Sequence, residues 1–291
     1  MKRITLIILI IGIAMFSACA SNAETTSHGK SSTEKEENKN QEHVQESEDE
    51  KKSGGEESEE DAAGIEKDEH PNEAQYRISE NWSVIPIKEE TNEDVVLLTF
   101  DDAPDKNAVK MAKTLKDIDA QAIFFVNGHF IDTPEEEEKL KEIHEMGFMI
   151  GNHTFSHATL PDISEAEQKE EIISLNDRIE EIIGERPLFF RAPHGANTDY
   201  SIQVAEEDGM TVMNWTYGYD YFEPYMNAEK LAEAMISGEG PEVDVPYSLL
   251  KPGANLLMHD REWTAEALPD IVEGLREKGY EILDPALIET K

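Results

Sequence analysis

The chain has 291 residues, of which 31% are charged, and its formal net charge is −38 at pH 7. This acidity argues against nucleic acid or another polyanion as partner, because phosphate backbones are bound by clustered Lys and Arg. Residues 75–291 alone carry 46 acidic and 18 basic side chains. The acidity has two open explanations: solubility at high salt or high pH, and attraction to an amine-bearing glycan. With a single cysteine, the folded part has no disulfides and must rely on its apolar core.

The first residues are typical of an export signal. Two basic residues precede an apolar run of about 13 residues, which is too short to span a bilayer. The run ends in Phe-Ser-Ala-Cys, which resembles the lipobox of bacterial lipoproteins. We therefore expect residues 1–18 to be a lipoprotein signal peptide and Cys19 to carry the lipid. The alternative is ordinary signal cleavage near Ala20 or Ala23.

The next segment, residues 19–74, consists mainly of Glu, Lys, Ser, Asn, Gln and Gly. Such a composition buries too little apolar surface to offset its ordering entropy, so we predict a disordered, self-repelling acidic tether. The tether would hold residues 75–291, one folded domain with its own core, at the outer face of the bacterial cytoplasmic membrane. We expect this domain to be a monomer.

Short apolar strands alternate with helices through the remaining chain. Gly147, Gly209 and Gly279 each end an expected helix and precede an apolar segment. This alternation predicts parallel βα units, either closed as a barrel or open as a wound sheet, with active groups at the carboxyl ends of the strands. The expected strands are 94–100, 121–126, 148–150, 187–190, 210–213, 255–258 and 280–283, and the first expected helices are 105–118, with Asp105 as N-cap, and 134–146.

A metal site is predicted where two of these strands end. His153 and His157 have the spacing that places two imidazoles on one side of a helical turn, about 6 Å apart at Cβ. Imidazole suits zinc, and a catalytic zinc takes three protein ligands. Asp101 and Asp102 end a buried strand, where unpaired carboxylates are costly, so we expect the third ligand there and infer Asp102. Zinc is the expected divalent cofactor.

The other strand ends supply the remaining chemistry for attack of water on an amide or ester. Asp101 is the expected general base and Arg191 its charge partner. His259 is expected to protonate the leaving group, and the backbone N–H of His194 to stabilise an oxyanion. Each has an alternative: Asp101 as a surface acid or N-cap, Arg191 as a structural ion pair, His194 as a pocket-wall residue and His259 as a core histidine. For Trp215 and Tyr221 two roles are equally open: packing in the core, or stacking of the aromatic ring against a sugar of the substrate.

Four motifs, at 99–102, 153–157, 191–195 and 257–259, resemble those of the polysaccharide deacetylases with a NodB homology domain, carbohydrate esterase family 4. The resemblance implies a distorted (β/α) barrel, a zinc-like metal, and removal of N-acetyl groups from amino sugars or O-acetyl groups from xylan. It assigns Asp101, Asp102, His153, His157, Arg191 and His259 the same roles, and Leu257 would line the acetyl pocket.

Two positions depart from the family pattern. Ala192 stands where a proline is usual. The fourth family motif, Asp-x-x-Asp-Trp, is reduced to one acid followed by a tyrosine, and Asp220 is our candidate for the acid that tunes His259.

The expected function is a membrane-tethered, metal-dependent deacetylase of peptidoglycan or another N-acetylglucosamine glycan. The anchor motivates this substrate, since a tethered enzyme acts on what lies near the membrane. An acetyl-xylan esterase is the alternative within the same chemistry. An inactive glycan-binding lipoprotein and a metal-binding lipoprotein are the alternatives from other classes.

Overall fold

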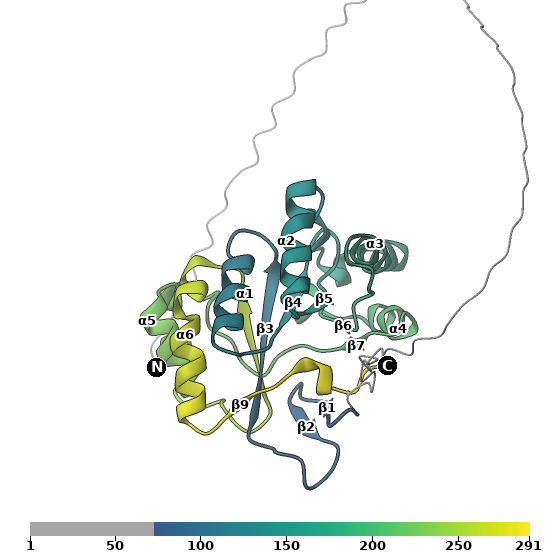
Figure 1. The fold of residues 1–291 in the computed structure, drawn as a ribbon. Coiled ribbons are helices and arrows are strands. Elements are labelled where there is room, and N and C mark those ends of the chain that lie inside the picture. Colours follow the sequence, from purple (N-terminus) through teal and green to yellow (C-terminus); the bar gives the residue numbers. More distant parts are fainter. Residues whose placement is uncertain (1–72) are drawn as a thin grey trace, which may run out of the picture. The chain divides into compact units, whose positions relative to one another are not determined.

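The computed structural model describes residues 73–291, so the predictions about the signal peptide, Cys19 and the tether lie outside the described residues. The described part is an α/β domain with a seven-stranded parallel sheet in the order β7-β6-β5-β4-β3-β8, with β9 also paired to β3 (Figure 1). Its elements are β1 Tyr76–Ile78, β2 Val84–Pro86, β3 Val95–Ala103, α1 Ala108–Asp117, β4 Ile123–Val126, α2 Pro134–Glu145, β5 Met149–Asn152, α3 Glu165–Ile183, β6 Phe189–Phe190, α4 Asp199–Glu207, β7 Thr211–Val212, α5 Ala228–Ser237, β8 Ala254–His259, α6 Glu262–Glu277 and β9 Glu281–Ile282.

The sheet curls until its two ends meet. Beyond β7 the chain crosses to β8, where the Thr216 N–H donates to the carbonyl of Asn255 at 2.8 Å and the Leu257 N–H donates to Tyr217 at 2.9 Å. At Gly218 the crossing segment runs so close to β8 that an added Cβ would lie 2.3 Å from the Leu257 carbonyl oxygen. The predicted distorted (β/α) barrel is therefore confirmed.

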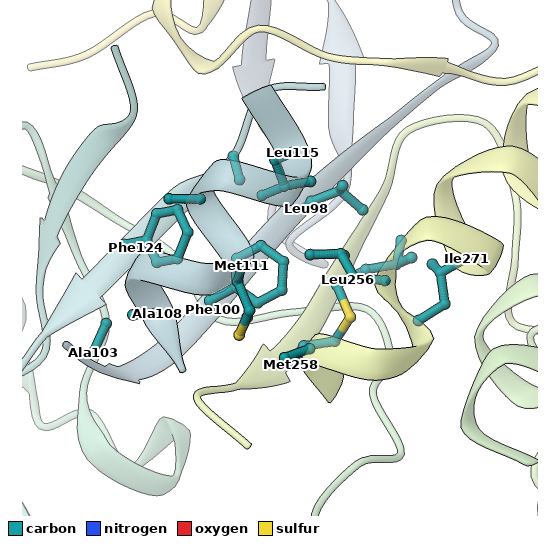
Figure 2. Packing of buried hydrophobic residues seen from close by; sticks show 14 of the residues in the cluster. Leu98, Phe100, Ala103, Ala108, Met111, Leu115, Phe124, Leu256, Met258 and Ile271 are labelled. Carbon is teal, nitrogen blue, oxygen red and sulfur yellow. The ribbon is translucent and has the colours of Figure 1, made fainter. Parts of the chain in front are cut away.

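The outer face of the sheet packs against helices, and Figure 2 shows the centre of this core between β3, β8, α1 and α6. Because side chains alternate along a strand, every second residue of β3 points to this layer. Leu98 and Phe100 do so and are fully buried against Met111 and Leu115 of α1. The alternation leaves Thr99 and Asp101 facing the inside of the barrel.

The inside of the barrel changes from apolar to polar along the strands. Near the amino ends, Val95 and Leu97 of β3 pack with Ile123 and Phe125 of β4. The β1–β2 hairpin closes this end, since Tyr76 and Val84 belong to the same cluster. Apolar side chains therefore fill the amino end of the barrel, and the polar groups lie at the carboxyl ends of the strands, where the sequence predicts them.

Some local predictions need correction. The first helix begins after Asn107, and Asp105 is not its N-cap. The buried carboxylate of Asp260 instead accepts the Asn107 and Ala108 N–H groups at 2.6 and 2.9 Å, so a residue from the far end of the chain caps α1. The prediction that Gly147, Gly209 and Gly279 each end a helix is confirmed, since all three follow a helix and have positive φ. Among the described helices, none is long and apolar enough to cross a membrane.

Candidate active site

Strand register brings the predicted groups into one layer at the carboxyl ends. Asp101 of β3 lies directly opposite His259 of β8. Asn152 of β5 pairs with Phe190 of β6, so the next residues, His153 and Arg191, emerge side by side. Residues separated by more than 150 positions in the chain thus meet at one mouth of the barrel.

Asp102, His153 and His157 form a cluster that could hold a metal ion, with one ligand atom from each lying within 4.8 Å of the others. The Asp102 Oδ1 atom is 3.4 Å from His157 Nε2 and 4.0 Å from His153 Nε2. Ligand atoms about 2.0–2.2 Å from a tetrahedral zinc lie roughly 3.4 Å from one another, so the spacing fits such an ion.

The protonation of both histidines also fits a metal ligand. The His153 Nδ1–H donates to the carbonyl of Arg191 at 2.7 Å; a carbonyl can only accept, so the Nε2 lone pair faces the cluster. Burial lowers the pKa of His153. Burial and the neighbouring His153 lower the pKa of His157 to about 4. Both imidazoles are therefore neutral at pH 7, as ligation requires.

The turn that carries these histidines is not helical, contrary to the prediction. Thr154 and His157 have φ of +68° and +60°, outside the helical range. The Asn152 side-chain oxygen accepts the Thr154 N–H at 2.8 Å, and the Glu171 carboxylate accepts the Ser156 N–H at 2.7 Å. The Asn152 contact is local and competes with a helix, while the Glu171 contact comes from α3, and the two together set the turn.

Asp101 is held by a fully buried arginine. The Arg191 Nη1 group donates to Asp101 Oδ1 at 2.7 Å and to Thr99 Oγ1 at 2.9 Å, while its Nη2 group donates to the Asn214 carbonyl. Burial would raise the pKa of Asp101, but the charge and hydrogen bond of Arg191, joined by His153 and His259 when they are protonated, outweigh it, so this pKa is lowered. The other carboxyl oxygen, Oδ2, lies 3.6 Å from His153 Nε2. Asp101 is thus an ionised carboxylate beside the metal cluster.

Asp220 contacts His259 in the way that the sequence predicts for its tuning partner. The His259 Nδ1–H donates to Asp220 Oδ1 at 2.8 Å, and the His259 backbone N–H donates to Oδ2 at 2.6 Å. The Thr264 hydroxyl also donates to Oδ2. Burial would lower the pKa of His259, but the Asp220 carboxylate outweighs it and raises that pKa. Within residues 73–291 no hydrogen bond to the Nε2 atom of the ring is found, so this atom is available to a substrate.

A pocket of about 400 Å³ joins these groups. Leu257 forms part of its wall, as do His194, whose ring lies 5.0 Å from that of His157, and Trp215. Tyr221 is 40% exposed at the pocket, with its ring 5.5 Å from that of His259. The four predicted substrate-contacting residues therefore line one cavity with the charged groups.

Arg261 is a pocket residue that the sequence reasoning missed. Its Nη2 group donates to Asp102 Oδ2 at 2.9 Å, opposite the oxygen that faces the histidines. The signal was present, because Arg261 follows β8 by two residues, as the other site residues follow their strands. Thr264, on the first turn of α6, was also missed.

Comparison with known proteins identifies the family. The polysaccharide deacetylase family model matches residues 88–213. A peptidoglycan-N-acetylglucosamine deacetylase of Bacillus cereus is 30% identical over 197 residues, covering 64% of this chain and 67% of that protein. The peptidoglycan-N-acetylmuramic acid deacetylase PdaA of Bacillus subtilis is 28% identical, covering 65% and 69%. A CE4 family pseudoenzyme from Bacillus anthracis has a similar structure, with a TM-score of 0.57, 26% identity and coverage of 65% and 63%. These matches span about two thirds of the length of each relative. The resemblance inferred from the motifs is confirmed, and the chain belongs to the polysaccharide deacetylase family.

Proposed function

We propose that the protein is a metal-dependent deacetylase that hydrolyses N-acetyl groups of a cell-wall amino-sugar polymer. One observation carries the proposal. An ionised carboxylate, Asp101, and a protonatable imidazole, His259, lie opposite each other on neighbouring strands, beside a cluster that could hold a metal ion and within one pocket. Hydrolysis of an unreactive amide needs such a base and acid on either side of the scissile bond.

The residues divide the reaction between them. Asp102, His153 and His157 would hold a divalent ion, which would supply Lewis acidity toward the acetyl carbonyl and lower the pKa of a bound water. Asp101 takes a proton from the attacking water, and Arg191 keeps that carboxylate ionised and oriented. His259 gives its proton to the leaving nitrogen as the carbon–nitrogen bond breaks, and Asp220 stabilises the imidazolium form. The products are acetate and a free amine.

The proposed substrate is peptidoglycan or a related N-acetylglucosamine polymer. Two relatives at 28–30% identity are named for deacetylation of peptidoglycan amino sugars, one at N-acetylglucosamine and one at N-acetylmuramic acid. The sequence motivates a lipid anchor at Cys19, which would keep the enzyme at the outer face of the cytoplasmic membrane and close to the wall. Trp215 and Tyr221 are proposed to contact the sugar.

An inactive, glycan-binding role is the second candidate, because a related structure is that of a pseudoenzyme. The intact arrangement of Asp101, Asp102, His153, His157, Arg191 and His259 favours catalysis, since a binding protein has no need of a base and an acid around a metal cluster. An acetyl-xylan esterase would use the same groups on an ester.

Acetate release tests the proposal. The purified, zinc-loaded protein is offered N-acetylglucosamine oligomers, peptidoglycan glycan strands and acetylated xylan, with Asp101→Asn as control. Release from the amino-sugar substrates, lost in the control, is expected. Release from xylan alone would replace the proposal with the esterase, and glycan binding without any release would replace it with the inactive binder.

A further inference from the structure

Arg261 gives the pocket a positive charge that the proposed mechanism does not use. It is the only Lys or Arg among the described residues that line the pocket, and 36% of its side chain is exposed. We propose that Arg261 makes the pocket selective for an amino sugar that bears a carboxylate beside its acetamido group. The inference rests on the deacetylase function proposed above and names the substrate class more closely.

The guanidinium is fixed in place before any substrate arrives. Its Nη2 group donates to Asp102 Oδ2 at 2.9 Å and its Nη1 group to the Asp260 carbonyl at 3.3 Å. The backbone there is also fixed, since the Asp260 carboxylate caps α1 and its N–H donates to the carbonyl of Asp101. Two of the five guanidinium N–H groups take part in these contacts among the described residues, and a carboxylate ligand needs at most two more.

The charges of the pocket favour an anion at this position. Asp101 is paired with Arg191, and Asp220 is paired with His259. Asp102 contacts Arg261 with one carboxylate oxygen and faces the two histidines of the candidate metal site with the other. When Asp102 is committed to a divalent cation, none of the described carboxylates that line the pocket is left to neutralise Arg261. The pocket is then locally positive in a strongly acidic protein, and it attracts an anionic group that the rest of the surface repels.

The geometry places this charge next to the reacting acetamido group. Asp102 Oδ1 faces His153 and His157, and Arg261 holds the other oxygen of the same carboxylate. Only the Asp102 carboxylate therefore separates Arg261 from the proposed metal position, where the acetyl carbonyl would be polarised. In a 2-acetamido sugar, the substituent on ring carbon 3 is adjacent to the acetamido group. A carboxylate carried there as a lactyl ether, as in N-acetylmuramic acid, comes within reach of the guanidinium.

The test compares one glycan in two charge states. Peptide-free glycan strands containing N-acetylmuramic acid are used with the lactyl carboxylate either free or amidated, and kcat/KM is measured for both. The ratio of the two values is the readout, because any loss that acts through Asp102 affects both substrates equally and cancels. In Arg261→Gln the ratio of free to amidated should fall about 10- to 100-fold, the usual cost of a charge-assisted contact. Arg261→Lys should keep part of the preference. Arg276→Gln, a matched loss of charge on the far end of α6, should keep all of it.

Two outcomes would overturn the inference. An unchanged ratio in Arg261→Gln, with both rates lowered alike, would make Arg261 only a positioning residue for Asp102. If the wild-type protein releases acetate from neither glycan, the proposed function fails. Calorimetric binding of N-acetylmuramic acid and of its amide then decides whether Arg261 still selects the carboxylate. A preference for the acid that Arg261→Gln abolishes would support the inference, and equal binding of acid and amide would refute it.

Discussion

Replacing Asp220 by Asn should disable the proposed acid while leaving the metal cluster intact. The fixed donors around Asp220 dictate how an amide would sit. The His259 backbone N–H always donates to the Oδ2 position, so the amide oxygen must occupy that position and the NH2 group must face His259 Nδ1. An NH2 group can only donate, so the ring is held with Nδ1 unprotonated and its imidazolium form is disfavoured.

The expected cost follows from the lost interaction. A hydrogen bond to a charged group contributes about 1.5–3 kcal/mol, which corresponds to roughly a 10- to 150-fold loss of kcat/KM at neutral pH. The pH profile gives a sharper test. Asp220 raises the pKa of His259, and the protonated form is the acid, so activity is present below that pKa and is lost as pH rises through it. Without the carboxylate, this alkaline limb should move to lower pH. The acid limb, which belongs to Asp101, should stay in place.

The assay is acetate release across pH on a zinc-loaded sample, with zinc content measured in parallel. Asp260→Asn is the matched control. It removes another buried carboxylate, one that caps α1 and makes no side-chain contact with His259 among the described residues. That variant should lose stability without moving the alkaline limb. An Asp220→Asn enzyme with near wild-type activity and an unmoved alkaline limb would refute the role assigned to the His259–Asp220 pair.

Three further predictions concern the other assigned groups. Asp101→Asn should retain zinc at full stoichiometry and lose about 10²–10⁴-fold in kcat, the usual share of a general base, and unchanged turnover would exclude Asp101 from that role. His153→Ala should lose one of three ligands and therefore bind zinc at least tenfold more weakly by competition with a chelator; full retention would remove His153 from the ligand set. Cys19→Ala should release the protein from membranes without detergent, and continued membrane association in fractionation would contradict the lipid anchor.

The fold was largely predictable because apolar runs mark the buried parallel strands. Charged or polar residues that follow a run mark the end of the strand. Asp101, Arg191 and His259 were found for this reason, each directly after or at the end of such a run. Once parallel strands are assumed, their carboxyl ends must meet, so residues distant in sequence become neighbours. The N-terminal hairpin was not foreseen, because β1 and β2 are only three residues long each and carry almost no periodic signal.

Contacts that depend on tertiary placement could not be predicted. Asp260 caps a helix that begins about 150 residues earlier, and Arg261 contacts a carboxylate on another strand. Asp260 has no local signal that distinguishes it from an ordinary charged residue before a helix. The place of Arg261 after β8 marks it as close to the site, but does not say which carboxylate it contacts. The closing segment was also missed, because Tyr217 joins β8 by a single bridge and not by a recognisable strand. Such contacts are decided by barrel closure, which no local pattern encodes.

The helical turn wrongly predicted at His153 exposes a general feature of this site. Seven non-glycine residues of the described chain have positive φ, and four of them are Asp102, Thr154, His157 and His194. Each such conformation costs on the order of 1–3 kcal/mol and persists only where the surroundings enforce it. Here the enforcement comes from buried contacts, such as the Asn152 side chain on the Thr154 N–H and the Arg191 carbonyl on His153. Local propensity therefore fails at the residues that matter most, because the fold holds the ligand set in an unfavourable backbone. The backbone at these residues is therefore set by contacts with distant parts of the fold, and a local sequence pattern cannot report it.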